Sequence, residues 1–229
     1  MDVVIIGAGG HGKVIADILR AASLAGTCDA RLIGFLDADP SLRGKLVADL
    51  PVLGPVNQLT KLWQQKVRHA VVAIGDSRTR RRHGDLLREY GFEAINAIHP
   101  SAVVSPTAVL GHGIVICAQA AVCTEARIGD FAIINTGSVI DHECRIGIGV
   151  HIAPGAHLAG RVNVQDEAFV GIGANIIQCL NIGAGSVVGA GAVVTRDVPP
   201  GVTVVGVPAR VIEVEEEISG NEAGGKATI

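Results

Sequence analysis

Aliphatic residues recur at every sixth position through the second half of the chain. Between positions 104 and 194 each sixth residue is Val, Ile or Leu, with no insertion: Val104, Leu110, Ile116, Val122, Ile128, Ile134, Ile140, Ile146, Ile152, Leu158, Val164, Val170, Ile176, Ile182, Val188 and Val194. A period of six fits neither an amphipathic helix nor an alternating strand. It is typical of a parallel β-helix, in which each hexapeptide forms one side of a three-sided coil.

Small side chains follow these anchors at a fixed distance. Four positions after an anchor the residue is often Ala or Ser: Ala108, Ala120, Ala126, Ala132, Ser138, Ala156, Ala168, Ala174, Ser186 and Ala192. A narrow prism has room for one large aliphatic residue per side, with small residues sharing the interior. Cys144 occupies the same position in the repeat, so we expect it to fill the interior and not to act as a nucleophile.

Residues 1–97 have a different pattern, in which strands alternate with helices. The sequence predicts strands at 3–6, 30–36, 70–74 and 93–98, the last of which enters the coil. It predicts helices at 11–22, 57–66 and 78–90. This alternation is typical of a small parallel sheet with covered faces. We therefore expect an α/β domain over 1–97, a β-helix domain over 98–212, and a solvated acidic tail over 213–229.

Composition excludes several classes of protein. The formal charge of −3 and the isoelectric point near 6.2 argue against a general nucleic-acid binder. No apolar run reaches the 18 residues or more of a membrane span, so we expect no membrane insertion. The five cysteines are odd in number and make no CxxC pair, which indicates reduced thiols in a cytoplasmic protein. We expect no metal.

A glycine loop lies between the first predicted strand and helix. Gly7-Ala8-Gly9-Gly10-His11-Gly12 matches GxGxxG, and Asp37 ends the second strand where a dinucleotide fold carries its ribose acid. However, a dinucleotide-binding fold consists of two mononucleotide-binding halves, and a domain of 97 residues is large enough for only one of them. A helix N-terminus favours phosphate oxygens, so a single nucleotide linked to a sugar fits better than NAD. The alternative is a turn that merely joins strand and helix.

Three histidines lie close together within the repeat, at His142, His151 and His157. Glu143 follows His142 directly. An imidazole beside a carboxylate is a candidate general base, because its unperturbed pKa lies near neutrality. The alternative is that each histidine is only a polar residue at a corner of the prism.

Several motifs stand in an order that resembles a known family. They are Gly7–Gly12, Gly34–Asp37, Asn135-Thr136, Asp141–Cys144, His151–Gly155, Gly160 and Val205–Arg210. Together they resemble the acetyl-CoA-dependent sugar acetyltransferases of the PglD/NeuD type, over residues 1 to about 212. The resemblance implies a left-handed β-helix, a homotrimer, and active sites at subunit boundaries. The six-residue spacing alone does not predict this handedness.

The resemblance also implies roles for individual residues. His142 matches the catalytic base, Glu143 the carboxylate that raises its basicity, and Asn135 a residue that lines the acceptor amine's pocket. The positions expected to bind the nucleotide-linked amino sugar are Gly9, Gly10, His11, Asp37, Ala38 and Gly75, and His11 also lines the amine's pocket. The positions expected to bind acetyl-CoA are His151, Gly160, Ile172 and Ala190. Ala38 departs from an acidic pair that is common at this point in the family.

The expected activity is direct N-acetylation of a UDP-, GDP- or dTDP-linked 4-amino-4,6-dideoxy sugar by acetyl-CoA. O-acetylation of a sialic acid is an alternative within the family. A zinc carbonic anhydrase is a remote alternative, because the histidine spacings do not give the matching ligand set. A nucleotide-binding scaffold without activity is the remaining alternative, and it predicts binding without release of CoA thiol.

Overall fold

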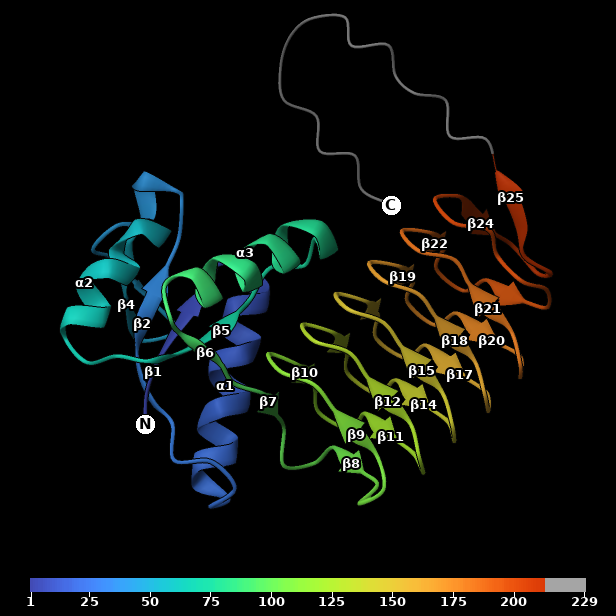
Figure 1. Cartoon of the computed structure of the whole chain (residues 1–229), viewed down its shortest axis with the longest axis horizontal. Coiled ribbons are helices and arrows are strands. Elements are labelled where there is room, and N and C mark those ends of the chain that lie inside the picture. Colours follow the sequence, from blue (N-terminus) through green and yellow to red (C-terminus); the bar gives the residue numbers. More distant parts are fainter. Residues whose placement is uncertain (213–229) are drawn as a thin grey trace, which may run out of the picture.

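The computed structural model describes residues 1–212 and consists of an α/β part followed by a coil of stacked strands (Figure 1). The predicted acidic tail lies outside the described residues. None of the described helices is long and apolar enough to cross a membrane.

The α/β part is built on one sheet of six strands, which we call the N-terminal sheet. Its strand order is β3-β4-β2-β1-β5-β6, and all neighbours are parallel except β3 and β4. The strands are β1 (Asp2–Ile6), β2 (Arg31–Leu36), β3 (Leu46–Val47), β4 (Leu50–Gly54), β5 (His69–Val72) and β6 (Glu93–Ala94). The helices are α1 (Gly10–Leu24), α2 (Leu59–Gln64) and α3 (Ser77–Glu89), with 3-10 turns at Pro40–Leu42 and Val56–Gln58.

The two faces of this sheet are covered by different helices. Val3 and Ile5 of β1 pack with α1, whereas Val4 and Ile6 pack on the opposite face with residues of α2 and α3. Both faces are therefore buried, which explains the nearly continuous apolar run of β1. The sequence prediction missed β3 and β4, and it was wrong to join 93–98 into one strand. Glu93–Ala94 belongs to the N-terminal sheet and Ala97–Ile98 to the coil.

The coil is a left-handed parallel β-helix with three sheets. Coil sheet 1 contains β7 (Ala97–Ile98), β10 (Val115–Ile116), β13 (Ile133–Ile134), β16 (His151–Ile152), β19 (Phe169–Val170), β22 (Val187–Val188), β24 (Thr203–Val205) and β25 (Arg210–Ile212). Coil sheet 2 contains β8 (Val103–Val104), β11 (Ala121–Val122), β14 (Val139–Ile140), β17 (His157–Leu158), β20 (Asn175–Ile176) and β23 (Val193–Val194). Coil sheet 3 contains β9 (Val109–Leu110), β12 (Arg127–Ile128), β15 (Arg145–Ile146), β18 (Asn163–Val164) and β21 (Asn181–Ile182).

The register of the coil follows the anchors. Strands pair in parallel with partners eighteen residues away, as in Ile116 with Ile134 and Ile134 with Ile152. Every anchor is the second residue of a strand, and all are buried except Val104 and Leu110 in the first coil, which are half-buried. The small residues after the anchors share this interior, and Cys144 is buried among them as predicted.

The α/β part is joined to the coil by shared hydrophobic contacts. Helix α1 packs between the N-terminal sheet and the outward side chains of coil sheet 1, which include Val115 and Ile133 (Figure 1). On the other side Phe131 of the coil inserts into the core beneath α3, where a Cβ on Gly84 would lie only 2.4 Å from its ring. The two parts therefore have one continuous core at their junction.

Candidate active site

Three loops meet at the carboxyl edge of the N-terminal sheet. They follow β1, β2 and β5, and they carry Gly9, Gly10, Asp37, Ala38 and Gly75. Strands β2 and β5 lie on opposite sides of β1, so this edge is a topological switch point, where open α/β sheets bind ligands. The structure brings the predicted nucleotide positions together here.

Glycine occurs in these loops for two different physical reasons. Gly7 has a φ of +104° and Gly12 lies so close to Gly7 that a Cβ on it would be 2.1 Å from the Gly7 carbonyl oxygen, so both are required by the fold. By contrast, a Cβ on Gly9, Gly10 or Gly75 would meet nothing within 4 Å. Their lack of a side chain leaves open space over the loops, where a ligand can approach the backbone.

Asp37 ties two of the loops together. Its carboxylate accepts hydrogen bonds from the backbone N–H of Ala8 at 2.8 Å and of Asp39 at 2.9 Å. The first turn of α1 receives no hydrogen bond from a capping side chain and contains no acidic residue. The loop edge thus combines a fixed backbone with an uncapped helix N-terminus, which favours phosphate groups.

Behind the loops, where α1 and α3 meet coil sheet 1, lies a group of polar side chains that we call the junction cluster. It consists of His11, Arg80, Asn135 and His151. The Nδ2 group of Asn135 lies 3.2 Å from Nε2 of His151, while its Oδ1 accepts the backbone N–H of Thr136 at 2.8 Å. This second bond fixes the orientation of the amide, so Nδ2 donates and Nε2 accepts.

Both histidines of the junction cluster are held neutral. Burial lowers the pKa of His11 to about 4, and the positive charge of Arg80 acts in the same direction. Burial likewise lowers the pKa of His151 to about 3, with Arg80 and His11 as further causes. The Gly75 carbonyl opposes the shift at His151, although it makes no hydrogen bond of good geometry to the ring. Nε2 of His11 and Nδ1 of His151 are buried and have no hydrogen-bond partner among residues 1–212.

His142 and Glu143 form a separate pair at the turn between β14 and β15. Nδ1 of His142 lies 3.0 Å from Oε2 of Glu143, and both side chains are about half exposed, at 50% and 49%. A Cβ on Gly160, one coil further on, would lie 2.5 Å from the imidazole ring. Gly160 is therefore needed to leave room for the ring, and Nε2 of His142 has no hydrogen-bond partner in the described part of the chain.

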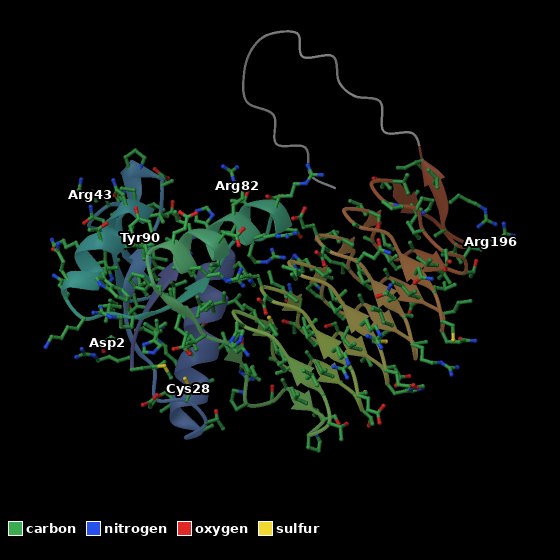
Figure 2. The ribbon with its side chains drawn as sticks, in the orientation of Figure 1. Asp2, Cys28, Arg43, Arg82, Tyr90 and Arg196 are labelled. Atoms are coloured by element: carbon green, nitrogen blue, oxygen red, sulfur yellow. The ribbon has the colours of Figure 1, made fainter. Side chains whose placement is uncertain are left out.

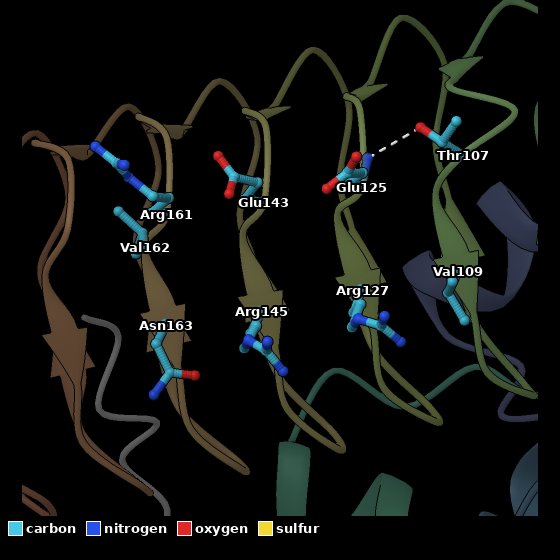
Figure 3. Close-up of a pocket in the computed structure, with 9 residues that line it drawn as sticks. All are labelled: Thr107, Val109, Glu125, Arg127, Glu143, Arg145, Arg161, Val162 and Asn163. Atoms are coloured by element: carbon cyan, nitrogen blue, oxygen red, sulfur yellow. Dashed lines mark hydrogen bonds between the residues drawn. The ribbon is translucent and has the colours of Figure 1, made fainter.

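Glu143 also lines a cavity of about 420 Å³ along the outer side of coil sheet 3 (Figure 3). The other lining residues are Thr107, Val109, Glu125, Arg127, Arg145, Arg161, Val162 and Asn163. Arg127 and Arg145 are paired in register on neighbouring strands, and neither forms a salt bridge within residues 1–212. The sequence analysis did not identify this cationic wall beside the histidine.

The predicted site residues do not form one site within the chain. The turn that carries His142 joins coil sheets 2 and 3, so it is the corner opposite coil sheet 1, where His151 lies. Asn135, Ile172 and Ala190 lie at the corner between coil sheets 1 and 2. The structure therefore separates the predicted base from the predicted acceptor pocket by the width of coil sheet 2.

Arg80 is the buried residue that the sequence analysis missed. It stands in an arginine-rich helix with Arg78, Arg81 and Arg82, whose side chains are not buried. Only the packing of α3 against the coil distinguishes it from its neighbours. Within residues 1–212 no group of three His, Cys, Asp or Glu side chains is arranged to hold a metal ion.

Comparisons with known proteins identify relatives over nearly the whole chain. A family model described as the PglD N-terminal domain matches residues 2–85. The GDP-perosamine N-acetyltransferase of Escherichia coli O157:H7 is 36% identical over 211 residues, which cover 90% of this chain and 94% of that protein.

Solved structures agree with this result. PerB from Caulobacter crescentus, in complex with CoA and GDP-perosamine, is 45% identical with a TM-score of 0.87, covering 93% of this chain and 98% of that one. Variants of that enzyme with one histidine replaced by Asn or Ala hold the same two molecules. The acetyltransferase domain of PglB from Neisseria gonorrhoeae, in complex with acetyl coenzyme A, is 36% identical with a TM-score of 0.82, covering 92% of this chain and 98% of that one.

Proposed function

Because this chain belongs to the PglD/NeuD-type family of sugar acetyltransferases, it is an acyltransferase, and we propose that it acetylates the amino group of a nucleotide-linked 4-amino-4,6-dideoxy sugar. Acetyl-CoA is the proposed donor, since relatives bind CoA or acetyl-CoA. GDP-perosamine, named for two relatives, is the first acceptor to test.

The observation that carries this proposal is the His142–Glu143 pair, with its 3.0 Å contact and its free Nε2. In our proposal the amine nitrogen attacks the thioester carbon and His142 accepts the amine proton. The C–S bond then breaks, and the proton passes to the leaving sulfur to give CoA thiol. Glu143 stabilises the imidazolium that forms in between.

Direct transfer is favoured over a covalent acyl-enzyme. Cys144, the cysteine nearest His142 in sequence, is buried, and burial raises the pKa of its thiol to about 11. A thiol in this state is a poor nucleophile. Two substrates bound together gain rate from proximity alone. In our proposal a hydrogen-bond donor near His151 stabilises the oxyanion that develops on the thioester carbonyl oxygen. Donors of this kind raise the rate by about 10²–10³ in other enzymes.

We further propose that the active site is completed in a homotrimer. Coil sheet 2 lies between the two corners that carry the predicted residues, and its outward side chains are uncharged or histidine: Val103, Ala121, Val139, His157, Asn175 and Val193. Coil sheet 3, by contrast, carries Arg127 and Arg145 among its outward side chains. If three copies turn coil sheet 2 toward a common axis, the Asn135 corner of one copy meets the His142 corner of its neighbour.

In this arrangement residues 1–97 of one subunit hold the nucleotide sugar and residues 98–212 of adjacent subunits hold acetyl-CoA. The groove between subunits would include Ile172, which is 61% exposed in the single chain, and Ala190. We also propose a cytoplasmic location, which is supported by the five free cysteines and by the use of acetyl-CoA.

A thiol-release assay tests the proposed function. Purified protein is given acetyl-CoA with GDP-, UDP- and dTDP-linked 4-amino sugars, and with a sialic acid as the O-acetylation control. We expect CoA release with at least one amino sugar and none with sialic acid. Release with sialic acid alone would establish the alternative, and binding without any release would indicate a scaffold.

Replacement of the proposed base tests the mechanism. His142→Ala removes the proton acceptor, so we expect kcat to fall by about 10²–10⁴ while acetyl-CoA affinity changes less than about twofold. Glu143→Gln keeps the shape of the pair but removes the charge, and we expect a smaller loss of about 10- to 100-fold. Steady-state kinetics and calorimetric titration with acetyl-CoA measure both effects. Wild-type turnover by the His142→Ala protein would overturn the assignment.

A further inference from the structure

Arg80 is a fully buried cation at the junction of the two parts of the chain. Its side chain is 0% exposed, and burial lowers the pKa of its guanidinium to about 10. The partners of its N–H groups are backbone carbonyls and one hydroxyl, and no carboxylate forms a salt bridge with it within residues 1–212. Burying a charge without a direct ion pair costs free energy, and the nearby carboxylate of Asp76 offsets that cost only in part.

The hydrogen bonds of Arg80 connect three segments that are distant in sequence. Nη1 donates to the carbonyls of Ile74 and Gly75, both at 2.8 Å, in the loop after β5. Nε donates to the Phe131 carbonyl at 2.7 Å. Nη2 donates to the Gly149 carbonyl at 2.6 Å, with a longer contact of 3.4 Å to Val150.

This arrangement uses the shape of the guanidinium. Phe131 and Gly149 stand eighteen residues apart, so Arg80 spans two successive coils as well as the nucleotide-side loop. The five N–H groups of arginine radiate in one plane and can serve acceptors on three sides. A lysine has three donors at one point and cannot reach the same set.

The segments that Arg80 joins carry the two halves of the acceptor pocket. Gly75 belongs to the open loop edge of the N-terminal sheet. Val150 directly precedes His151, whose Nε2 accepts the hydrogen bond that orients Asn135. A displacement of one segment relative to the other would therefore move the nucleotide-side loop away from the Asn135 side chain.

We propose that Arg80 is a positioning residue for the acceptor, which fixes the loop at Gly75 in register with the His151–Asn135 pair. This inference rests on the proposed function, because it assumes that the acceptor spans these two groups. Arg80 does not touch substrate in this proposal. It acts through the carbonyls that it holds.

The charge of Arg80 serves the same arrangement. His151 must be neutral for its Nε2 to accept from Asn135, since both nitrogens of an imidazolium are donors. A cation close to His11 and His151 disfavours protonation of either ring. The guanidinium therefore supports the hydrogen bond between His151 and Asn135 by its charge as well as by its geometry.

The test compares four variants of the full-length protein. Arg80→Lys keeps the charge and loses the planar fork, and Arg80→Gln loses both. Arg82→Gln is the matched control for charge, because Arg82 lies on the exposed side of the same helix (Figure 2). Phe131→Leu is the control for packing, since it loosens the contact between α3 and the coil but keeps the backbone carbonyl that Arg80 uses.

We expect both Arg80 variants to raise KM for the nucleotide amino sugar by about tenfold or more. KM for acetyl-CoA should rise by a clearly smaller factor because, of the proposed acetyl-CoA positions, Arg80 supports only His151 and makes no hydrogen bond to Gly160, Ile172 or Ala190. Arg82→Gln should match wild type. Phe131→Leu should lower the melting temperature without raising the KM for the nucleotide sugar. If Arg80→Gln does not fold, Arg80→Lys decides the question alone.

Two results would overturn the proposal. One is an unchanged nucleotide-sugar KM in Arg80→Lys. The other is an equal loss for both substrates, matched by Phe131→Leu, which would reduce Arg80 to a structural residue. A wild-type protein that acetylates no amino sugar contradicts the proposed function instead. In that case calorimetry with GDP, UDP or dTDP, whichever wild type binds, still tests whether Arg80→Lys weakens nucleotide binding about tenfold.

Discussion

At the scale of single residues, the protein holds its histidines in two opposite environments. His142 stands half exposed beside a carboxylate, whereas His11 and His151 are largely buried beside a cation. The first environment suits a group that takes up and releases protons. The second suits groups that stay neutral and act through hydrogen bonds.

The buried histidines make stability depend on pH. In the unfolded chain both rings take up protons below a pKa near 6.5, whereas in the folded chain they do so only near 4 and 3. Stability is therefore complete above about pH 6.5 and is lost as the pH falls toward these folded values. We expect a loss on the order of 3 kcal/mol between pH 7 and pH 5, measured by urea unfolding.

Single substitutions identify the groups responsible for this loss. His11→Asn and His151→Asn should each reduce the pH dependence by about half. A pH dependence that persists in the double variant of His11 and His151 would contradict this explanation.

At the scale of elements, the loop between β1 and α1 separates structural glycines from open ones. Gly12 is enclosed by the backbone of Gly7, while Gly10 faces open space at the start of α1. A sequence motif treats these positions alike. In the structure Gly12 is required by the close packing of the loop, whereas Gly10 leaves open space above the loop.

A matched pair of substitutions tests this distinction. Gly12→Ala places a methyl group 2.1 Å from a carbonyl oxygen, so we expect a loss of about 2 kcal/mol or more in stability. Gly10→Ala meets no atom and favours the helix, so stability should stay equal or rise by up to about 1 kcal/mol. Its nucleotide-sugar KM should rise about tenfold if the backbone of Gly10 contacts the ligand. Thermal unfolding and steady-state kinetics measure both, and normal kinetics in Gly10→Ala would argue against the site.

At the scale of the whole molecule, the separation of His142 from His151 is the main feature. His142 lies at the corner opposite the coil sheet that carries His151, so the predicted base and the predicted acceptor pocket do not meet within one chain. The outward face of coil sheet 2 between them carries no Asp, Glu, Lys or Arg on its strands, and it is the surface that the proposed trimer would bury. The proposed activity therefore depends on assembly.

Co-expression of two inactive chains tests this dependence. Gly10→Phe blocks the nucleotide-side loop and His142→Ala removes the base, so each chain alone should be inactive. Every trimer that contains both chains has about one site in three that combines two intact halves, so we expect about a third of wild-type activity. Differently tagged chains purified through both tags provide the sample. An inactive mixture that contains both chains would show that each site lies within one subunit.

The sequence by itself determined the coil and much of the α/β part. The register of every anchor strand follows from the six-residue period, because a buried aliphatic residue is needed at each side of each coil. The alternation of strands and helices also predicted α1, α3 and the parallel core of the sheet. Strand β3 was missed because two residues at the sheet edge carry too little apolar pattern, and β4 was missed because Pro51 and Gly54 interrupt its apolar run.

Only the tertiary structure decided which predicted site residues meet. Sequence spacing gave the positions of His142, His151 and Asn135 within the six-residue repeat. It did not show which of them are neighbours, because successive hexapeptides lie on different faces of the coil. It also could not distinguish Arg80 from the exposed arginines beside it, since burial at that position arises from α3 packing on two coils. The local sequence pattern determines which side chains point into the coil. The packing of distant segments determines which polar side chains lie next to one another at the site, because those contacts join residues far apart in the sequence.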